Sequence, residues 1–166
     1  MPVTFLLLDA AEVTTVDDYL ALQAETCPQP QPERFRVHRR QPGFTLAEAR
    51  NGQYLVGYAY GMPLRPSTDW WRRLTAPLPD DVTAEHQGRT FALTGLAVRA
   101  AWRRQGIGRT LQELILHDRP EERATSTAPT GAAAAQAAYL AWGWHKVART
   151  SGQPVHDVFL LDLTHA

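Results

Sequence analysis

The amino-acid sequence predicts an α/β protein of the α+β kind, built on a mixed sheet that begins antiparallel. Residues 91–98 form an uncharged, largely apolar run, which is typical of a buried strand. Apolar side chains then recur with a helical period over residues 107–115 and share one face. Upstream, residues 44–49 and 54–60 flank Asn51-Gly52, a dipeptide typical of a β-hairpin turn, and we expect the side chains of residues 54–60 to alternate between the two faces of their strand. A hairpin followed by a strand–turn–helix unit therefore predicts a mixed sheet.

The other elements follow from local signals. Residues 3–8 are apolar and predict a first strand, and a pair of acidic residues predicts the start of a helix from Asp17 to about Ala24. Three prolines within residues 27–32 end that helix. The remaining expected elements are, in chain order, a helix at 33–40 with Pro32 in its first turn, a short helix capped by Ser67 or Asp69 inside the long connection 61–88, a strand at 123–128, a helix at 132–142 followed by Gly143, and strands at 145–150 and 155–163.

Length and composition limit the class of protein. The chain has 166 residues, 44% of them apolar, so we expect a single domain over residues 1–166. A formal net charge of +0 argues against a non-specific nucleic-acid or anionic-membrane binder. Cys27 is the only cysteine, so no intrachain disulfide is expected and a cytoplasmic location fits. The apolar run near the N-terminus is too short for a membrane span or a signal sequence.

The turn between the predicted strand and helix carries the strongest functional signal. It holds two glycines, Gly106 and Gly108, and three arginines, Arg103, Arg104 and Arg109. A strand that runs through such a turn into a helix presents free main-chain N–H groups to one point, with the positive end of the helix dipole behind them. Glycine lets an anion approach the main chain closely. The turn therefore predicts a diphosphate-binding site.

Two common nucleotide motifs do not fit this turn. A Walker A loop requires a Gly-Lys pair, which the chain lacks, and a dinucleotide fingerprint requires a third glycine where Leu111 stands. The remaining pattern, Arg103-x-x-Gly106-x-Gly108, resembles the pyrophosphate-binding signature of the GCN5-related N-acetyltransferase (GNAT) superfamily. Taken alone, these residues also fit an ordinary strand–turn–helix connection with solvated arginines.

A second motif strengthens the resemblance. Many members of this superfamily carry a helix that reads N-x-x-A-x-x-L-Y-x-x-x-G-F, and here Ala135, Tyr139, Gly143 and Trp144 stand at four of its places. Ala132 stands where asparagine is usual. The two motifs follow each other in the family's order, and the matched parts cover nearly half of the chain.

The resemblance implies the GNAT fold, a mixed and mostly antiparallel sheet of six to seven strands with helices on both faces. It also implies acetyl-CoA as co-substrate, held in an opening between the strand that ends at Val98 and the strand at residues 123–128. In the strand that ends at Val98, Leu96 and Val98 would pair with the amides of the pantetheine, which would lie against them as an added strand does. The implied acetyl-CoA-binding residues are Leu96, Ala97, Val98, Arg103, Arg104, Gln105, Gly106, Ile107, Gly108, Arg109, Thr110, Ala135 and Tyr139.

Acetylation of an amine also needs two proton transfers. Tyr139 matches the family tyrosine beside the sulfur and is the expected general acid, the alternative being a core tyrosine. The base stays open, because Gly95 stands near the family's usual acidic position. Glu85 is the candidate catalytic base, with His86 and His117 as further candidates, and each of the three is alternatively a solvated side chain. A water chain that ends on main-chain carbonyls would serve equally.

These expectations describe an N-acetyltransferase that moves an acetyl group from acetyl-CoA to a primary amine of a small molecule, by direct attack in a ternary complex. Trp70 and Trp71 are expected to bind the acceptor, or alternatively to pack as a lid on the domain. A peptide or protein N-acetyltransferase is one alternative function. A non-catalytic acyl-CoA sensor is another, favoured by Gly95 and Ala132. No nucleic acid, membrane or metal is expected as a partner, and the resemblance is compatible with a homodimer.

Overall fold

A computed structural model describes residues 2–163 of the chain. The chain divides into two compact units. Among the described residues, unit 1 comprises residues 2–62 and 93–119, and unit 2 comprises residues 63–92 and 120–163. The elements are β1 (Val3–Asp9), α1 (Asp17–Thr26), α2 (Pro32–Arg39), β2 (Thr45–Asn51), β3 (Tyr54–Pro63), α3 (Asp80–Thr83), β4 (Thr90–Val98), a 3-10 turn (Ala100–Trp102), α4 (Ile107–Leu116), β5 (Arg123–Pro129), α5 (Ala133–Ala141), β6 (His145–Arg149) and β7 (His156–Asp162).

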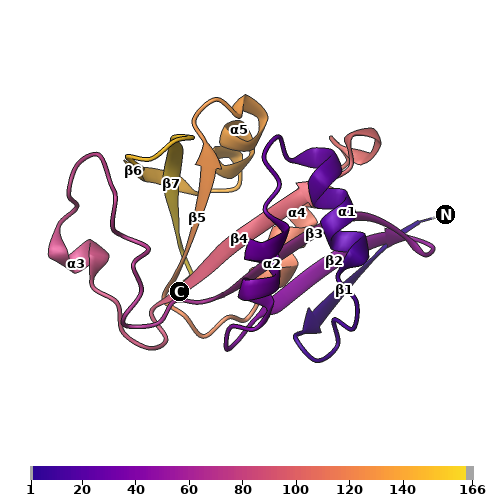
Figure 1. Cartoon of the computed structure of the whole chain (residues 1–166), viewed down its shortest axis with the longest axis horizontal. Coiled ribbons are helices and arrows are strands. Elements are labelled where there is room, and N and C mark those ends of the chain that lie inside the picture. The colour runs from indigo at the N-terminus through magenta and orange to yellow at the C-terminus, as the bar shows by residue number, and fades with distance from the viewer. Residues whose placement is uncertain (1, 164–166) are drawn as a thin grey trace. The chain divides into compact units, whose positions relative to one another are not determined.

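The strands form one seven-stranded sheet in the order β1-β2-β3-β4-β5-β7-β6 (Figure 1). The first three strands pair antiparallel, β4 pairs with β5 in parallel, and β7 pairs antiparallel with both β5 and β6. The parallel ladder joins Thr90–Ala92 of β4 to Arg123–Thr125 of β5. The sheet is therefore mixed and mostly antiparallel, which confirms the predicted fold class.

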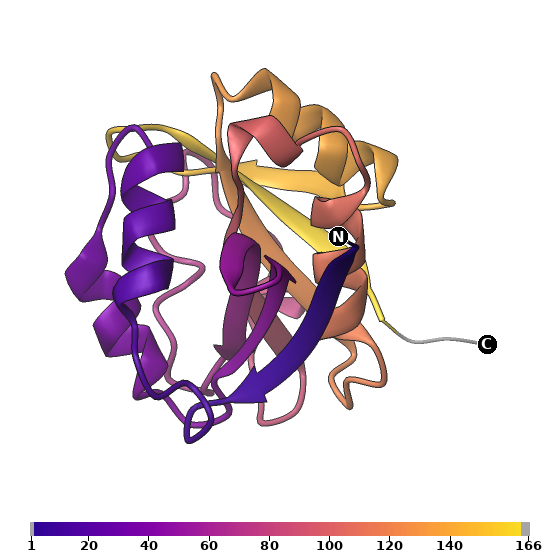
Figure 2. The same cartoon turned by 90° about the vertical axis from the view of Figure 1, so that its right-hand side faces the viewer.

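In unit 1 the helices cover both faces of the strands. Helices α1 and α2 lie on one face and α4 lies on the other (Figure 2). Helix α4 packs on β1 and β2 through the predicted apolar face, where Ile107, Leu111 and Ile115 are buried. The core under α1 and α2 is aromatic; its buried members are Val13, Tyr19, Leu22, Phe35, Phe44, Leu46, Leu55, Tyr58, Tyr60 and Met62.

A bulge in β3 changes which side chains face that core. Ala49 of β2 pairs with Gly57, but the next residue of β2, Arg50, pairs with Leu55, so Val56 is the extra residue. Leu55 therefore joins the core that holds Tyr58. Strict alternation along residues 54–60 is the wrong expectation here, because one extra residue reverses the facing of every earlier side chain.

Unit 2 places α5 on one face of β5 and β7. The helix ends in the predicted way: Gly143 has φ of 94°, its N–H donates to the carbonyl of Leu140, and the N–H of Trp144 donates to the carbonyl of Tyr139. This is a Schellman cap, which Gly143 permits because it adopts a left-handed conformation without strain. Rings of Tyr139 and Trp144 are in contact across the cap, with centroids 5.3 Å apart.

The long connection between β3 and β4 differs from the prediction. No helix begins at Ser67 or Asp69; residues 67–74 form turns, and the helix of this segment is α3. Arg73 has φ of 60°, which a right-handed helix does not allow. Its carbonyl accepts a hydrogen bond from the N–H of Ser151, and Leu74 bridges to Thr150. Long-range main-chain bonds therefore replace the local helical bonds that the capping signal favoured.

Candidate active site

The predicted diphosphate turn lies in unit 1 and carries free main-chain donors. The N–H groups of residues 104–109 have no hydrogen-bond partner among residues 2–163. The last three of them begin α4, where no side chain caps the helix. Unpaired N–H groups at a helix N-terminus, together with the helix dipole, favour an anion. The turn therefore has the donor set that a diphosphate needs.

Two left-handed residues shape this turn. Arg104 has φ of 63° and Gly106 has φ of 79°, and a Cβ on Gly106 would meet no atom within 4 Å. The requirement for glycine at position 106 is therefore one of main-chain conformation and of open space above the turn. Thr110 closes the first turn of α4, because both its N–H and its hydroxyl donate to the carbonyl of Gly106 at 3.0 Å.

The three arginines of the turn have different surroundings. Arg103 is folded back, and its Nε donates to the carbonyl of Val98 at 2.9 Å. Arg109 forms an exposed ion pair with Glu113, one helical turn along α4. Arg104 is exposed and has no partner among the residues that the structure describes. Its charge is therefore the most available to a bound anion.

Gly57 on β3 fixes the strand that leads into the turn. A Cβ at this position would lie 3.0 Å from the carbonyl oxygen of Ala97, 3.2 Å from Cδ1 of Leu111 and 3.3 Å from Cγ2 of Val98. A larger residue would push β4 and α4 away from β3. The half-buried residues Leu96, Ala97 and Val98 thus owe their position to this close approach.

Tyr139 lies on α5 in unit 2, almost completely buried, with 6% of its surface exposed. Its hydroxyl is 2.9 Å from the hydroxyl of Ser126 on β5, and its ring stacks on Phe159 with centroids 5.2 Å apart. Burial raises the pKa of Tyr139, and the hydrogen bond with Ser126 opposes that effect. The phenol therefore keeps its proton at neutral pH and can act as a donor. Ala135 lies one helical turn earlier on α5 and is half-buried.

Glu85 lies in unit 2 and is a buried ion-pair partner instead of a solvated side chain. Only 2% of its side chain is exposed, and its Oε2 accepts hydrogen bonds from Nε1 of Trp71 at 2.8 Å, from Oγ1 of Thr90 at 2.9 Å and from Nη2 of Arg123 at 2.9 Å. Oε1 is buried without a partner among residues 2–163. Burial lowers the pKa of Arg123, and the hydrogen bond to Glu85 opposes that effect. The carboxylate thus stabilises the buried guanidinium.

The other candidate bases and the two tryptophans are placed as follows. His86 and His117 are exposed and lie next to carboxylates, as solvated side chains do. Both tryptophans are half-buried with their N–H groups directed into unit 2, Trp70 toward Thr125 at 3.1 Å and Trp71 toward Glu85. Their indole N–H groups are therefore already engaged by the protein.

Gly95 on β4 is covered by the ring of Tyr60. A Cβ at Gly95 would lie 2.3 Å from Cε2 and 2.6 Å from Cδ2 of that ring. The Tyr60 hydroxyl is 3.0 Å from Nδ1 of His38 on α2. The space that an acidic side chain at position 95 would need is thus filled by an aromatic ring. Sequence reasoning missed Tyr60 and His38; one available signal was the spacing of Arg34 and His38, which places both on one face of α2.

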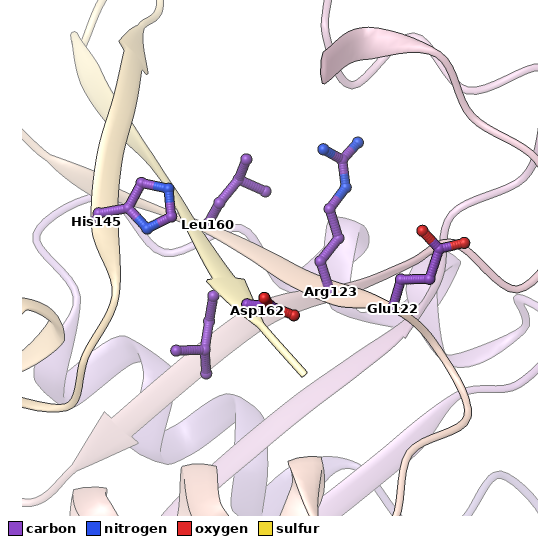
Figure 3. Close-up of a pocket in the computed structure, with 6 residues that line it drawn as sticks. Glu122, Arg123, His145, Leu160 and Asp162 are labelled. Carbon is purple, nitrogen blue, oxygen red and sulfur yellow. The ribbon is translucent and has the colours of Figure 1, made fainter. Parts of the chain in front are cut away.

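A shallow pocket of about 290 Å³ lies in unit 2, lined by Glu122, Arg123, His145, Leu160, Leu161 and Asp162. Figure 3 shows His145 on β6, Leu160 and Asp162 on β7, and Arg123 at the start of β5 around it. Two carboxylates line this pocket, and its arginine already pairs with Glu85. The charge of this pocket therefore does not favour a diphosphate.

Comparisons with known proteins bear on the family and the fold of this chain. The sequence model of the acetyltransferase (GNAT) family matches residues 12–144, which is most of the chain. No curated protein is similar enough in sequence to count as a match.

Several solved structures share the fold. The ribosomal-protein-S18-alanine N-acetyltransferase from Escherichia coli is 15% identical, with a TM-score of 0.71 over 99% of this chain and 96% of that one. Arabidopsis thaliana NAA60, solved with acetyl-CoA, is 12% identical, with a TM-score of 0.70 over 97% and 98% of the two chains. A GNAT family acetyltransferase from Elizabethkingia anophelis, also with acetyl-CoA bound, is 12% identical, with a TM-score of 0.64 over 96% and 97%.

Proposed function

Because this chain belongs to the GNAT family and is an acetyl-CoA-dependent acetyltransferase, we propose that it acetylates a primary amine of a small molecule by direct attack in a ternary complex. Bound acetyl-CoA supplies an activated thioester. The residues of this chain have three tasks: to hold the diphosphate, to align the pantetheine and to move two protons.

The glycine turn holds the diphosphate in this proposal. The partner-free N–H groups of residues 104–109 supply the donors, and the exposed Arg104 supplies positive charge. Residues 96–98 of β4 offer main-chain groups along which an extended pantetheine can lie as an added strand. The partner-free donors of the turn are the single observation that carries the proposal.

Tyr139 is the proposed general acid. Its phenol is buried, protonated at neutral pH and held by Ser126 and by the stacked ring of Phe159. A fixed O–H donor suits the protonation of a leaving thiolate. Glu85 suits the role of base poorly, because its carboxylate is already paired with Arg123 and its Oε2 already accepts hydrogen bonds from Trp71 and Thr90. We therefore propose that water removes the proton of the amine.

The test is a thiol-release assay with acetyl-CoA and a panel of small primary amines. We expect turnover with at least one amine, and we expect Gly106→Val to weaken acetyl-CoA binding at least about tenfold in calorimetry, because a β-branched residue disfavours φ of 79°. Gly152→Ala is the matched control, since a Cβ there meets nothing within 4 Å and φ is ordinary. Unchanged binding by the Gly106 variant would remove the turn from the site.

A protein N-terminus is the second candidate acceptor. The structural neighbours include an enzyme named for alanine of ribosomal protein S18, and the identity of 15% shows a shared fold alone. Peptides added to the same amine panel separate the two: selective release with peptides favours this second candidate. Tight acetyl-CoA binding without thiol release from any acceptor favours the sensor.

A further inference from the structure

Helix α2 concentrates positive charge over the core of unit 1. Residues 32–40 contain four arginines and one histidine but a single acidic residue, Glu33, in a chain of zero net charge. Glu33 pairs with Arg36 at 2.6 Å, and Arg39 donates to the carbonyl of Val13. Arg34 is exposed and has no hydrogen bond or ion pair among residues 2–163. Its guanidinium is therefore available to an anion.

Arg34 lies beside His38, because residues four apart share one face of a helix. Burial, and after it the charge of Arg34, lowers the pKa of His38 to about 4, and the same charge acts on Tyr60. The imidazole is therefore neutral at pH 7. Within residues 2–163, the titratable group that is hydrogen-bonded to it is the Tyr60 phenol, whose pKa burial raises to about 12.

The hydrogen bond between Tyr60 and His38 fixes the tautomer. Tyr60 is only 3% exposed, and Nδ1 of His38 is the sole partner of its hydroxyl within residues 2–163. A buried O–H donates wherever an acceptor is available, so Tyr60 donates and Nδ1 accepts. The proton of the neutral ring is then on Nε2. His38 thus presents an N–H donor, and it lacks the free ring lone pair that a general base needs.

Tyr60 connects His38 with β4, because its hydroxyl is hydrogen-bonded to His38 and its ring packs on that strand. Its ring covers Gly95, the residue directly before the stretch 96–98 along which we propose that the pantetheine lies. Any side chain at position 95 would collide with the ring, which is the hydrogen-bond partner of His38, so that either the ring or β4 would have to move. The glycine, the tyrosine and the histidine are therefore one arrangement, which ends in Arg34 on the surface of unit 1.

We propose that Arg34 and Nε2–H of His38 bind a carboxylate, or another anionic group, of the acceptor, so that the preferred acceptors are amines that carry an acid, such as free amino acids. This inference rests on the proposed function and names its substrate class. The two donors are a guanidinium and an imidazole N–H, the pair that can receive a carboxylate with charge-assisted hydrogen bonds.

The kinetic test uses matched pairs of acceptors, each an amino acid and its carboxamide. We expect the acid to be the preferred acceptor. Arg34→Gln should lower kcat/KM for the acid about 10- to 100-fold through KM, which is the effect of losing a charge-assisted hydrogen bond. The kcat/KM for the carboxamide should change less than about twofold. Arg34→Lys should retain part of the preference. Arg36→Gln is the matched control on the same helix, because Arg36 pairs with Glu33. Equal kcat/KM for acid and carboxamide, or an equal loss for both in Arg34→Gln, would overturn the inference.

A binding test separates this inference from the proposed function. N-acetylglycine and N-acetylglycinamide are titrated into the protein while the His38 ring protons are followed by NMR, with His38→Gln for assignment. We expect N-acetylglycine to shift the His38 signals and to bind more tightly than N-acetylglycinamide. Its affinity for the Arg34→Gln variant should be at least about tenfold lower than for the parent. Binding of N-acetylglycine without thiol release from any amine would support the anion site and contradict the proposed acetylation of a small amine. Thiol release without binding of N-acetylglycine would contradict the anion site alone.

Discussion

Gly95→Ala tests the arrangement around Tyr60 most directly. The new methyl group would lie 2.3 Å from Cε2 and 2.6 Å from Cδ2 of the Tyr60 ring, well inside van der Waals contact. The ring cannot move freely, because it packs on Phe35 with centroids 4.8 Å apart and on Phe44 at 5.6 Å. Either β4 shifts or the ring turns and breaks its hydrogen bond to His38.

The cost follows from these contacts. Overpacking of a dense core costs about 1–3 kcal/mol. Loss of the hydrogen bond between Tyr60 and His38 adds about 0.5–1.5 kcal/mol. We therefore expect Gly95→Ala to lower the free energy of unfolding by about 2–4 kcal/mol. Exposure of His38 would also raise its pKa from about 4 toward its ordinary value, because burial is the main cause of the depression.

A double-mutant cycle in urea, followed by tryptophan fluorescence, isolates the clash. Tyr60→Val removes the ring atoms that a Cβ at Gly95 would meet, so Gly95→Ala should cost less than about 1 kcal/mol in that background. Gly131→Ala is the control, since a Cβ there has no neighbour within 4 Å, and it should lie within about 0.5 kcal/mol of the parent. An equal cost of Gly95→Ala in both backgrounds would refute the steric argument.

Four further outcomes are expected. Gly106→Val should keep the fold, since its Cβ meets open space, while a conformational cost of about 1–2 kcal/mol appears in urea titration and acetyl-CoA binding weakens at least about tenfold. Tyr139→Phe should lower kcat about 100-fold or more with KM for acetyl-CoA nearly unchanged, and an equal kcat would show that Tyr139 is not the general acid. Glu85→Gln should destabilise by about 3 kcal/mol, because it leaves the buried Arg123 charge without its partner; a cost under about 0.5 kcal/mol would contradict the ion pair. The stability contributed by neutral His38 should be complete above its unfolded pKa of about 6.5 and lost as pH falls through about 4, because the unfolded chain takes up the proton first. His38→Gln should flatten this part of the curve of unfolding free energy against pH, and an unchanged curve would contradict the low pKa.

The local elements followed from local signals. The strand at residues 91–98, the helix at residues 107–115 and the hairpin at Asn51-Gly52 are all present, and Gly143 caps α5 as expected. The periodicity of side chains and the conformation that each turn needs are properties of a few neighbouring residues. The same holds for the diphosphate turn, where the glycine spacing itself indicated free N–H groups at a helix start.

The failures have a common cause. The predicted helix near Ser67 gave way to main-chain bonds between Arg73 and Ser151, and strict alternation in β3 gave way to a bulge at Val56. No helix among residues 2–163 is long and apolar enough to cross a bilayer. Each outcome depends on partners far away in the sequence.

The sequence by itself determined the family and the glycine turn at the start of a helix, because both depend on spacing within short stretches. Only the tertiary structure decided that Tyr60 fills the space beside Gly95, that Glu85 neutralises Arg123 and that Arg34, unpaired within residues 2–163, lies next to a neutral His38. Burial, pKa and ion pairing are set by neighbours through space, and packing brings those neighbours together from distant parts of the chain.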